Sequence, residues 1–561
     1  MMMNTRMIRM KRRYSTGNNG SALHWINNKI KNESMDNTIS KTATSYLTKI
    51  LTSEVYAIAN ETPLNFAANL SNTINNQAYI KREDTQPVFS FKIRGAYNKI
   101  AKLTPELRSK GVVTCSAGNH AQGVALSASR LGINATIVMP LATPLIKVNA
   151  VRRFGGPTVT VKLHGQNYDE AAAEAKRLVI ENKLTMVHPF DDPDVIAGQG
   201  TIGMEIIKSF VGKKLDVVFA CVGGGGLLSG IATSIKALRP DVKVIGVEAE
   251  DAAGMTESLV AGKVITLPQV GLFADGAAVK TVGEHTFKIC NELVDEMITV
   301  QTDEICAAIK HGFNDTRCVL EPAGALAIAG MVKYSKLYDC KDKTFVAISS
   351  GANMDFDRLR FVSERADSSE TLMSVAIPEQ PGSFRMLHSL LHPRNITEFS
   401  YRHNGSGSAN VFVSLQLLSG KKQDEDKSFV SKLLASKGYP VTDLSRNEMA
   451  KAHARHLVGG RGLESIVSSD DNKKMQELVY RFEFPEAPGA LDRFLTTVAK
   501  FNQGWSISLF HYRNHGHDFG RVLVGLLVEK SDMKAFESFL DNLGYTYYDE
   551  TSNIAYSQFL K

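Results

Sequence analysis

The sequence predicts an N-terminal α/β region with a doubly wound, mainly parallel sheet, followed by two smaller α+β units of the ferredoxin-like type. Two observations carry this prediction. From about residue 78 to 350, short apolar runs alternate with helical stretches, which is typical of βαβ units. After about residue 365 the character changes and one segment is repeated. A chain of 561 residues is also too long for one ordinary core, so several domains are expected.

Each element of the N-terminal region follows from an apolar run or a helical pattern bounded by turn residues. We predict strands at residues 78–82, 112–115, 135–139, 158–162, 217–222, 242–247 and 345–349. Helices are predicted at residues 90–103, in a stretch ending at Gly132, at 168–181, and between the last two strands before residue 250. In such sheets ligands bind at the carboxyl ends of the strands. The chemistry is therefore expected in the loops that follow the strands.

The C-terminal region contains an internal repeat. The turn sequence PEQPG at 378–382 returns as PEAPG at 485–489. Both copies show the order strand, helix, strand, strand, helix, strand, which suits a ferredoxin-like unit. We expect the two units at residues 371–446 and 475–554, with a helical, glycine-containing connector between about 446 and 474.

The similarity of the two copies continues beyond the turn. The segment ITEFSYRH at 396–403 matches ISLFHYR at 507–513. This alignment pairs Tyr401 with Tyr512. The two tyrosines are therefore expected at equivalent positions of the two units, either packed on the sheet or facing a small ligand.

The positive charge of the chain is concentrated at its start. The formal net charge is +7, and the first 32 residues contain no acidic residue. Their seven basic residues account for the whole net charge, so the remaining chain has no basic field that would bind nucleic acid. A leader that is rich in arginine and free of acids resembles a mitochondrial presequence. We expect residues 1–40 to be a transit peptide and disordered leader, and the mature protein to be mitochondrial. The basic residues are Arg6, Arg9, Lys11, Arg12, Arg13, Lys29 and Lys31.

Other classes of protein are disfavoured by composition. No apolar stretch reaches the roughly 18 to 20 residues that a membrane-spanning helix needs. The cysteines show no close spacing of the zinc-knuckle kind and none lies after residue 340, so neither a metal site nor a secreted disulfide framework is predicted. They are interpreted as reduced thiols at Cys115, Cys221, Cys290, Cys306, Cys318 and Cys340.

Four consecutive glycines follow a predicted strand, from Gly223 to Gly226, and Leu227 begins the next helix. Glycines in a row cost backbone entropy and contribute no packing, so they are tolerated where the main chain must approach a ligand closely. Their amides beside a helix N-terminus would cradle a phosphate. A dinucleotide fold is the rival interpretation, but its spacing demands glycine at position 229, which is Ser229.

Two further segments point to a cofactor that carries both an aldehyde and a phosphate. The sequence SFKIRGA at 90–96 opens a helix and contains Lys92. The sequence SAGNHAQG at 116–123 begins the next helix. A helical lysine alone is usually a solvated side chain, but here it coincides with a phosphate cradle and a second glycine-containing helix start.

These segments, together with SGAN at 350–353, resemble those of the biosynthetic threonine dehydratases, a family of fold-type II pyridoxal-phosphate enzymes. The resemblance covers nearly the whole chain after the leader, including tandem ACT-like regulatory units at the C-terminus. It implies a pyridoxal-phosphate-dependent catalytic domain at about 41–366. The implied reaction converts L-threonine to 2-oxobutanoate and ammonia through loss of the β-hydroxyl, at the start of isoleucine biosynthesis.

The resemblance also implies roles for matching residues. Lys92 would carry pyridoxal 5′-phosphate covalently, and Ser350 would face its ring nitrogen. Asn119 would bond the 3′ oxygen of the cofactor. Its phosphate would be bound by Gly223, Gly224, Gly225, Gly226 and Leu227. The substrate carboxylate would be held by the loop of Ser116, Ala117, Gly118 and His120, since amides at a helix start suit an anion. Less specific roles fall to Glu321, Asp275 and Gly276.

In the family, isoleucine inhibits and valine relieves that inhibition. The resemblance therefore implies these two effectors for the repeat, with Tyr401 and Tyr512 as candidate contacts. It further implies a homo-oligomer, expected to be a tetramer. No nucleic acid and no membrane is expected as a partner.

Three alternative functions fit the sequence less well. A serine racemase shares the catalytic motifs, but its loop carries serine where this chain has Ala117, and it lacks the regulatory half. A catabolic serine or threonine dehydratase would lack two tandem units and a leader. An amino-acid sensor that has lost catalysis would not need to retain Lys92, Asn119, the tetraglycine and Ser350.

Overall fold

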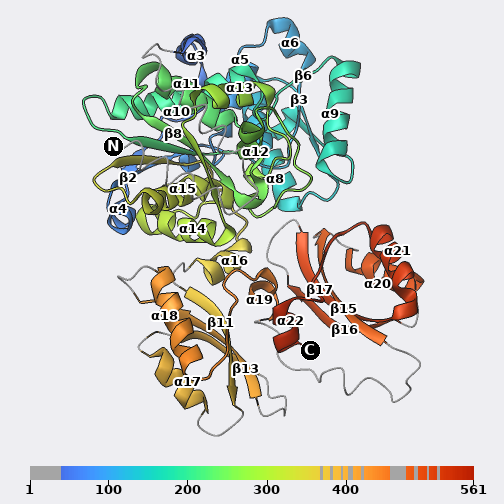
Figure 1. Ribbon diagram of the computed structural model, residues 1–561. Helices are drawn as coiled ribbons and strands as arrows, with labels where there is room; N and C mark the ends of the chain where they lie inside the picture. The colour runs from blue at the N-terminus through green and yellow to red at the C-terminus, as the bar shows by residue number, and fades with distance from the viewer. Residues whose placement is uncertain are drawn as a thin grey trace. The chain divides into compact units, whose positions relative to one another are not determined.

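A computed structural model describes the chain from residue 40, and the described chain forms two compact units, of which the first ends at residue 366 (Figure 1). The structure describes residues 40–366, 370–378, 383–392, 394, 396–401, 408–418, 423–454, 475–485, 490–501, 505–513 and 519–560. The expected leader, most of the two repeated turns and most of the expected connector lie outside the described residues.

The first unit contains two sheets instead of the single sheet that the sequence predicts. Their central strands, at residues 112–115, 217–221 and 344–349, are buried at every position, as is usual for parallel strands covered on both faces. The larger sheet has the order β1 (Leu64–Phe66), β2 (Gln77–Arg82), β10 (Thr344–Ser349), β7 (Val217–Cys221), β8 (Lys243–Ala249) and β9 (Glu296–Val300). All neighbours pair in parallel except β1, which is antiparallel to β2.

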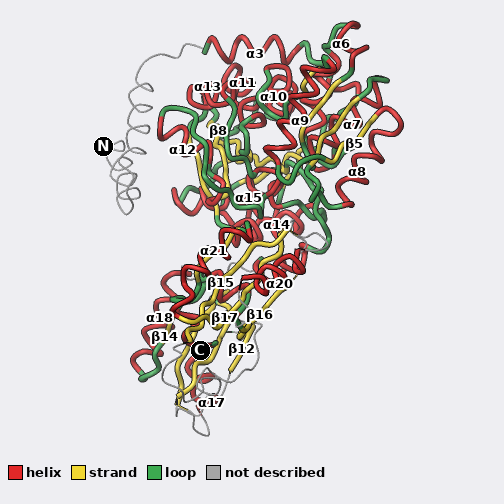
Figure 2. Tube along the Cα trace, turned by 90° about the vertical axis from the view of Figure 1, so that its right-hand side faces the viewer, coloured by secondary structure: helices red, strands yellow, loops and turns green. Residues whose placement is uncertain are grey.

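The smaller sheet is entirely parallel and builds a subdomain of its own. Its order is β5 (Val159–Leu163), β4 (Ala135–Met139), β3 (Val112–Cys115) and β6 (Thr185–Met186). Three helices gather around it, as Figure 2 shows, namely α7 (Asn119–Leu131), α8 (Leu145–Gly155) and α9 (Tyr168–Asn182). Residues of α7 and α8 share a buried cluster that is separate from the main core. We call this part the small subdomain.

Helices cover both faces of the larger sheet, so the doubly wound prediction is confirmed (Figure 1). One face carries α3 (Lys41–Leu51), α10 (Pro193–Ser209), α11 (Gly226–Leu238) and α13 (Glu284–Leu293); the other carries α4 (Ala68–Ile74), α14 (Thr302–Thr316) and α15 (Pro322–Tyr338). The remaining helices of the unit are α5 (Lys92–Ala101), α6 (Pro105–Lys110), α12 (Gly254–Ala261) and α16 (Arg358–Arg365). None of the described helices is long and apolar enough to cross a membrane.

Helix ends follow local sequence chemistry. Helix α6 begins after Thr104, whose hydroxyl accepts from the amide of Leu107, and Pro105 occupies the first helical position, where a missing N–H costs nothing. Helix α7 ends at Gly132, which adopts the left-handed conformation with φ 66°, a conformation that glycine adopts without strain. These local signals are the reason the helix stop at Gly132 could be predicted.

The second unit contains two copies of the predicted βαββαβ order, so the ferredoxin-like prediction is confirmed. The first copy has β11 (Glu370–Pro378), α17 (Ser383–Leu391), β12 (Ile396–Tyr401), β13 (Ser408–Gln416), α18 (Gln423–Ser436) and β14 (Val441–Asp443). The second has β15 (Met475–Pro485), α20 (Ala490–Phe501), β16 (Ser506–Arg513), β17 (Phe519–Glu529), α21 (Met533–Leu543) and β18 (Thr546–Asp549). Two short helices, α19 (Glu448–Ala452) and α22 (Ile554–Phe559), follow the two copies.

The two copies agree in register as well as in order. Their sheets are β12-β13-β11-β14 and β16-β17-β15-β18. The first edge strand of each has an irregularity near its start. Tyr401 lies opposite Val411 and Tyr512 lies opposite Val522, so the two tyrosines occupy equivalent positions of β12 and β16.

The copies also share a small core within the second unit. Leu372 and Phe412 of the first sheet belong to the same buried cluster as Val479 and Leu523 of the second. Tyr556 of α22 completes this cluster. Burial of apolar side chains between the two sheets therefore stabilises the pair as one unit.

Candidate active site

Lys92 lies at the first position of α5, and its backbone is fixed by the segment that contains Ser350. The amide of Phe91 donates to the carbonyl of Ser350 over 3.1 Å, and the amide of Ala352 donates to the carbonyl of Phe89 over 2.9 Å. Ser90 and Gly351 form an isolated antiparallel bridge. Two motifs that are more than 250 residues apart are thus joined by main-chain hydrogen bonds.

The amine of Lys92 lies in a partly buried position beside the tetraglycine loop. Its Nζ donates to the carbonyl oxygen of Pro189 over 2.8 Å, and the next residue, Phe190, packs on the loop. Burial lowers the pKa of the Lys92 amine to about 8, against the opposing influence of Cys221 and Glu321. An amine with this pKa is partly neutral near pH 7 to 8, and a neutral amine is a nucleophile and a proton acceptor.

Ser350 follows strand β10 and is almost fully buried. Its hydroxyl is 3.2 Å from the thiol of Cys221, which donates to it, and it donates in turn to the carbonyl of Ala323 over 3.3 Å. Burial raises the pKa of the Cys221 thiol to about 11, so Cys221 keeps its proton at neutral pH. Cys221 ends β7 and is separated from the glycine loop by Val222. No sequence pattern connects Cys221 with Ser350.

Asn119 begins α7 and is held by two side chains from other segments. Its Nδ2 donates to Glu321 Oε1 over 2.5 Å, and Asn353 Nδ2 donates to its Oδ1 over 2.7 Å. Glu321 immediately precedes α15 and makes no side-chain cap to that helix. The Glu321 carboxyl therefore does not cap the helix and belongs to this cluster.

Burial raises the pKa of Glu321 to about 7, and the negative charge of Asp275 adds to the effect. The hydrogen bond from Asn119 and the positive charges of Lys147 and Arg358 oppose it. The carboxyl is therefore able to gain or lose a proton close to neutral pH, as is typical of groups at functional sites.

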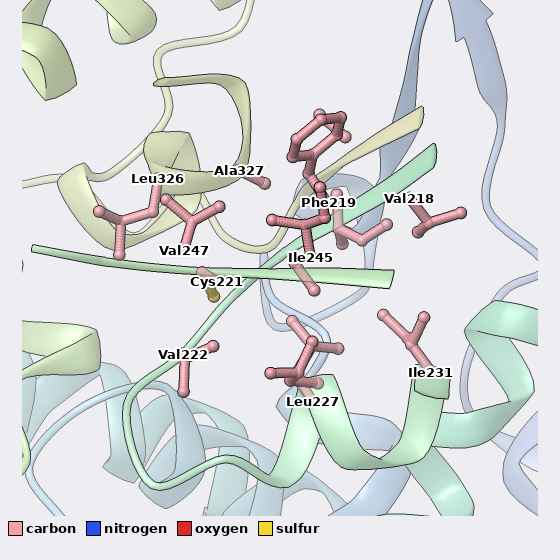
Figure 3. Packing of buried hydrophobic residues seen from close by; sticks show 14 of the residues in the cluster. Val218, Phe219, Cys221, Val222, Leu227, Ile231, Ile245, Val247, Leu326 and Ala327 are labelled. Atoms are coloured by element: carbon pink, nitrogen blue, oxygen red, sulfur yellow. The ribbon is translucent and has the colours of Figure 1, made fainter. Parts of the chain in front are cut away.

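The tetraglycine loop connects β7 with α11. Gly225 has φ +95°, a conformation that side chains other than glycine rarely adopt, and a Cβ on Gly224 would lie 2.2 Å from the ring of Phe190. Figure 3 shows Cys221 and Val222 at the end of β7 and Leu227 at the start of α11, within one apolar cluster. The first amides of α11 have no acceptor within their own helix. They are suited to an anion.

The loop from Ser116 to Gly118 joins β3 to α7, and His120 follows in the first turn of that helix. Ser116, Ala117 and Gly118 are partly exposed, whereas the His120 ring is buried. The His120 Nε2 lies 2.9 Å from the carbonyl oxygen of Val187, and burial lowers the pKa of the ring to about 3. The Ser116 amide donates to the carbonyl of Val138 and the Gly118 amide to the Ser116 hydroxyl, so the loop is fixed at both ends. The His120 side chain is engaged with the protein interior.

Asp275 lies in the short 3-10 helix η5 (Asp275–Ala277) between two cations. Lys147 Nζ of α8 is 2.9 Å from its Oδ2, and Arg358 Nη1 of α16 is 3.2 Å from its Oδ1. Burial alone would raise the pKa of Asp275, but these two cations lower it below its usual range. The next residue, Gly276, borders the cluster of Asn119 and Glu321.

Two residues after Lys92, Arg94 anchors the same helix in a fully buried ion network. Its guanidinium pairs with Glu83 over 2.8 Å and with Glu205 over 2.5 Å. Lys81 also pairs with Glu205. Two cations therefore face two carboxylates, and such balanced pairing is what permits charges inside a protein.

The structure thus brings Lys92, Asn119, the tetraglycine loop and Ser350 together around one region of the first unit. It places Tyr401 and Tyr512 in the second unit. Sequence reasoning did not identify several residues that contact this region, because their partners are distant in sequence: Cys221, Lys147, Pro189, Phe190 and Arg358. Within residues 40–366 and the described parts beyond them, no group of three His, Cys, Asp or Glu side chains is placed to hold a metal ion.

Comparisons with known proteins match both units. Residues 56–351 match the family described as pyridoxal-phosphate dependent enzyme, and residues 363–454 and 470–560 match the C-terminal regulatory domain of threonine dehydratase. The chain is 50% identical to the L-threonine dehydratase biosynthetic IlvA of Burkholderia multivorans, over 92% of this chain and 99% of that one. It is 47% identical to the mitochondrial threonine dehydratase of Saccharomyces cerevisiae, over 92% of this chain and 89% of that one.

Among solved structures, the processed form of threonine deaminase isoform 2 from Solanum lycopersicum is similar with 51% identity and a TM-score of 0.57. That match covers 58% of this chain and 89% of the other. Maize serine racemase is similar with 30% identity and a TM-score of 0.52, over 57% of this chain and 95% of that one. The likeness to the racemase therefore extends over little more than half of this chain.

Proposed function

The chain belongs to the threonine dehydratase family of pyridoxal-phosphate dependent enzymes, and from this premise we propose that Lys92 is its reactive amine in the deamination of L-threonine. The enzyme is a threonine ammonia-lyase, which releases 2-oxobutanoate and ammonia. The observation that carries the residue assignment is the position of Lys92: a partly buried amine of lowered pKa, beside a phosphate cradle and joined by main-chain bonds to the segment of Ser350.

The residues at the site fit pyridoxal phosphate. The amine of Lys92 suits the aldehyde, and the amides at the start of α11 suit the phosphate. Gly225 with its positive φ, and Gly224 with no room for a side chain beyond its backbone, give the close main-chain approach that a phosphate needs. We assign the phosphate to Gly223, Gly224, Gly225, Gly226 and Leu227, the 3′ oxygen to Asn119 and the ring nitrogen to Ser350.

When bound, the cofactor supplies an electron sink conjugated to the amino group of the substrate. The protein supplies the proton transfers and the orientation. Lys92, neutral in part because burial lowers its pKa to about 8, takes the proton from the α-carbon of threonine. Its hydrogen bond to the Pro189 carbonyl holds the amine on the side of the tetraglycine loop. Loss of the β-hydroxyl then completes the elimination.

Ser350 distinguishes this chemistry from that of enzymes that hold the ring nitrogen with a carboxylate. A hydroxyl carries no negative charge that would keep a ring nitrogen protonated. The Ser350 oxygen accepts from the Cys221 thiol, and the hydroxyl donates its single proton to the carbonyl of Ala323. A weaker electron sink favours rapid β-elimination over a long-lived carbanion, which suits a dehydratase.

The loop from Ser116 to Gly118 is assigned to the carboxylate of threonine, together with the backbone of His120. Backbone amides at a helix start bind anions, and this loop is partly exposed at the start of α7. Ala117 stands where serine racemases carry serine. Without a hydroxyl there, the chain lacks the second proton donor that racemisation needs, which favours elimination.

The second unit is assigned to regulation, with isoleucine as inhibitor and valine as the ligand that relieves inhibition. The two copies, at about 371–446 and 475–554, are separate from the catalytic domain at about 41–366. Equivalent positions of Tyr401 and Tyr512 in β12 and β16 make them the first candidates for effector contacts. The match of this unit to the family described as the C-terminal regulatory domain of threonine dehydratase supports this assignment.

The basic, acid-free leader supports a mitochondrial location, and the curated fungal relatives carry that location in their names. A homotetramer is proposed for the assembled enzyme. A fusion of residues 1–40 to a fluorescent reporter tests the location, since cytosolic fluorescence would exclude it. Sedimentation of the purified enzyme tests the assembly, since a mass below four chains would exclude a tetramer.

The function itself is tested by turnover. The purified chain, loaded with pyridoxal phosphate, is assayed with L-threonine, L-serine and D-serine for oxo acid, ammonia and inversion of configuration. The proposal expects 2-oxobutanoate and ammonia from L-threonine in equal amounts, with inversion of L-serine negligible by comparison. Racemisation as the main reaction, or no reaction with L-threonine, would overturn it.

A further inference from the structure

The ion cluster around Asp275 joins three segments that belong to different parts of the first unit. Lys147 comes from α8 of the small subdomain, Asp275 from η5, and Arg358 from the start of α16. Lys147 contacts Oδ2 over 2.9 Å, and Arg358 contacts Oδ1 over 3.2 Å with a second, longer contact to Oδ2. The Asp275 carboxylate thus binds Lys147 through one oxygen and Arg358 mainly through the other.

The two cations are carried by separate cores. Val148 and Val151 of α8 lie in the buried cluster of the small subdomain. Phe361 of α16 lies in the main core, where its ring packs on that of Phe273 at 5.2 Å. Phe273 is two residues before Asp275, so two contacts connect α16 with η5 and the residues before it. One is the ring contact of Phe361 with Phe273, and the other is the ion pair of Arg358 with Asp275. We call the part of the first unit that is built on the larger sheet the large subdomain. The contact from Lys147 therefore joins the small subdomain to the large subdomain.

The ion cluster around Asp275 lies directly beside the catalytic cluster. A Cβ on Gly276 would lie 3.1 Å from the Ala323 Cβ and 3.5 Å from Glu321 Oε1. The loop from Ser116 to Gly118, assigned to the substrate carboxylate, belongs to the same small subdomain as α8. A movement of α8 away from Asp275 would therefore carry the carboxylate loop away from the residues of the large subdomain.

We propose that Lys147, Asp275 and Arg358 form a positioning clamp that holds the small subdomain closed over bound threonine, with Arg358 orienting the carboxylate that Lys147 engages. This inference rests on the proposed function. The clamp touches neither the cofactor nor the reacting atoms. It acts by fixing the distance between the carboxylate loop and the cluster of Glu321 and Ser350, so its loss weakens substrate binding more than chemistry.

The first test compares kinetic constants for threonine in the loaded, full-length enzyme and its variants K147M, R358M, R358K and the double variant K147M/R358M. Loss of charged hydrogen bonds of this kind should raise KM about tenfold in each Met variant, with kcat changed less than about threefold. The double variant should resemble the more severe single variant because both cations act through one carboxylate. R358K should recover most of the affinity, since it keeps the charge.

The matched control is K236M. Lys236 forms an ion pair of 2.8 Å with Asp295, and both side chains are partly buried, as those of Lys147 and Asp275 are. This pair lies on α11 and the segment before β9, away from the catalytic cluster. Its loss should leave KM within about twofold of the unmodified enzyme.

A second readout does not depend on turnover. Amide hydrogen exchange in α8 should be faster in K147M than in the unmodified protein, while exchange in α9 of the same subdomain stays unchanged. Equal exchange in α8, or a KM for K147M and R358M no different from that of K236M, would overturn the clamp. An unmodified enzyme that does not act on threonine would instead overturn the proposed function, and the exchange result would still decide the clamp.

Discussion

The thiol of Cys221 donates to the hydroxyl of Ser350 over 3.2 Å, so two residues from the ends of neighbouring strands β7 and β10 share one hydrogen bond at the bottom of the catalytic site. Both are nearly inaccessible to solvent. The Ser350 oxygen uses one of its lone pairs on this thiol. Cys221 thereby sets the direction in which the Ser350 hydroxyl can donate.

Replacing Cys221 by alanine removes this donor. We expect the visible absorption of the bound cofactor to change and threonine turnover to slow, because Ser350 is then free to act as an acceptor toward the ring nitrogen. The free energy of unfolding should fall by about 1 kcal/mol for the lost hydrogen bond. C221S, which keeps a donor, should restore the spectrum.

Cys290 supplies a matched control for this substitution. Its thiol is 3.4 Å from the hydroxyl of Ser229, and it is also buried. C290A should lower stability to a similar degree without changing the cofactor spectrum. Equal spectra for C221A, C290A and the unmodified enzyme would show that Cys221 does not influence Ser350.

Glu321 should produce an ionisation near neutral pH. Burial raises its pKa from the ordinary 4.5 to about 7, so the folded protein binds this proton more tightly than the unfolded chain does. Stability from this group is therefore present below about pH 4.5 and is lost as pH rises through about 7. The free energy of unfolding of the unmodified protein should fall steadily relative to that of E321Q, which cannot titrate at this position, as pH rises from 5 to 8.

The same carboxyl should shape the pH profile of turnover. It faces Asn119, Asp275, Lys147 and Arg358, and it also influences Lys92. An inflection near pH 7 in kcat/KM for threonine should disappear in E321Q, which cannot titrate. An unchanged inflection in that variant would assign it to another group.

Substitution of Arg94 should lower the free energy of unfolding more than substitution of any other charged residue near Lys92. Replacing it by leucine leaves Glu83 and Glu205 buried without their main partner, which should cost about 3 to 5 kcal/mol in urea unfolding. The exposed pair of Lys208 and Glu61 is the control, and K208A should cost less than about 1 kcal/mol. Similar losses for the two variants would contradict the ion network as an anchor of α5.

Isoleucine should raise the apparent KM for threonine by several-fold to about a hundredfold, as expected for a coupling of roughly 1 to 3 kcal/mol. Helix α16 ends at Arg365, and the second unit begins at residue 367. A weaker isoleucine response is therefore expected in R358M than in K236M, measured as the ratio of KM with and without isoleucine. Absence of any response in the unmodified enzyme would remove the regulatory assignment and leave the catalytic one intact.

The sequence predicted those parts of the fold that depend on local patterns. Strands β3 and β4, the helix stop at Gly132 and the βαββαβ repeats follow from short-range apolar periodicity and turn chemistry, and the structure confirms them. The division into two sheets could not be predicted, because buried parallel strands have the same apolar pattern in either sheet. Strand β6 has only two residues and gives no pattern at all.

The catalytic motifs were found because each is a contiguous run of residues with a chemical meaning. The contact between Cys221 and Ser350, which are 129 residues apart, and the clamp around Asp275 were not found. Such pairs depend on which strands become neighbours and how two subdomains meet. Neither the order of strands in a sheet nor the contact between two subdomains can be inferred from the composition and motif spacing of a single sequence.

The central claim, that Lys92 is the reactive amine, is tested most directly by K92A beside K99A. Both lysines lie on α5, but Lys99 forms an ion pair with Asp192 over 2.7 Å at the far end of the helix. The account predicts that K92A loses the visible cofactor absorption of the purified protein and threonine turnover by many orders of magnitude, while K99A keeps both. A K92A enzyme that retains the absorption and the turnover would contradict it.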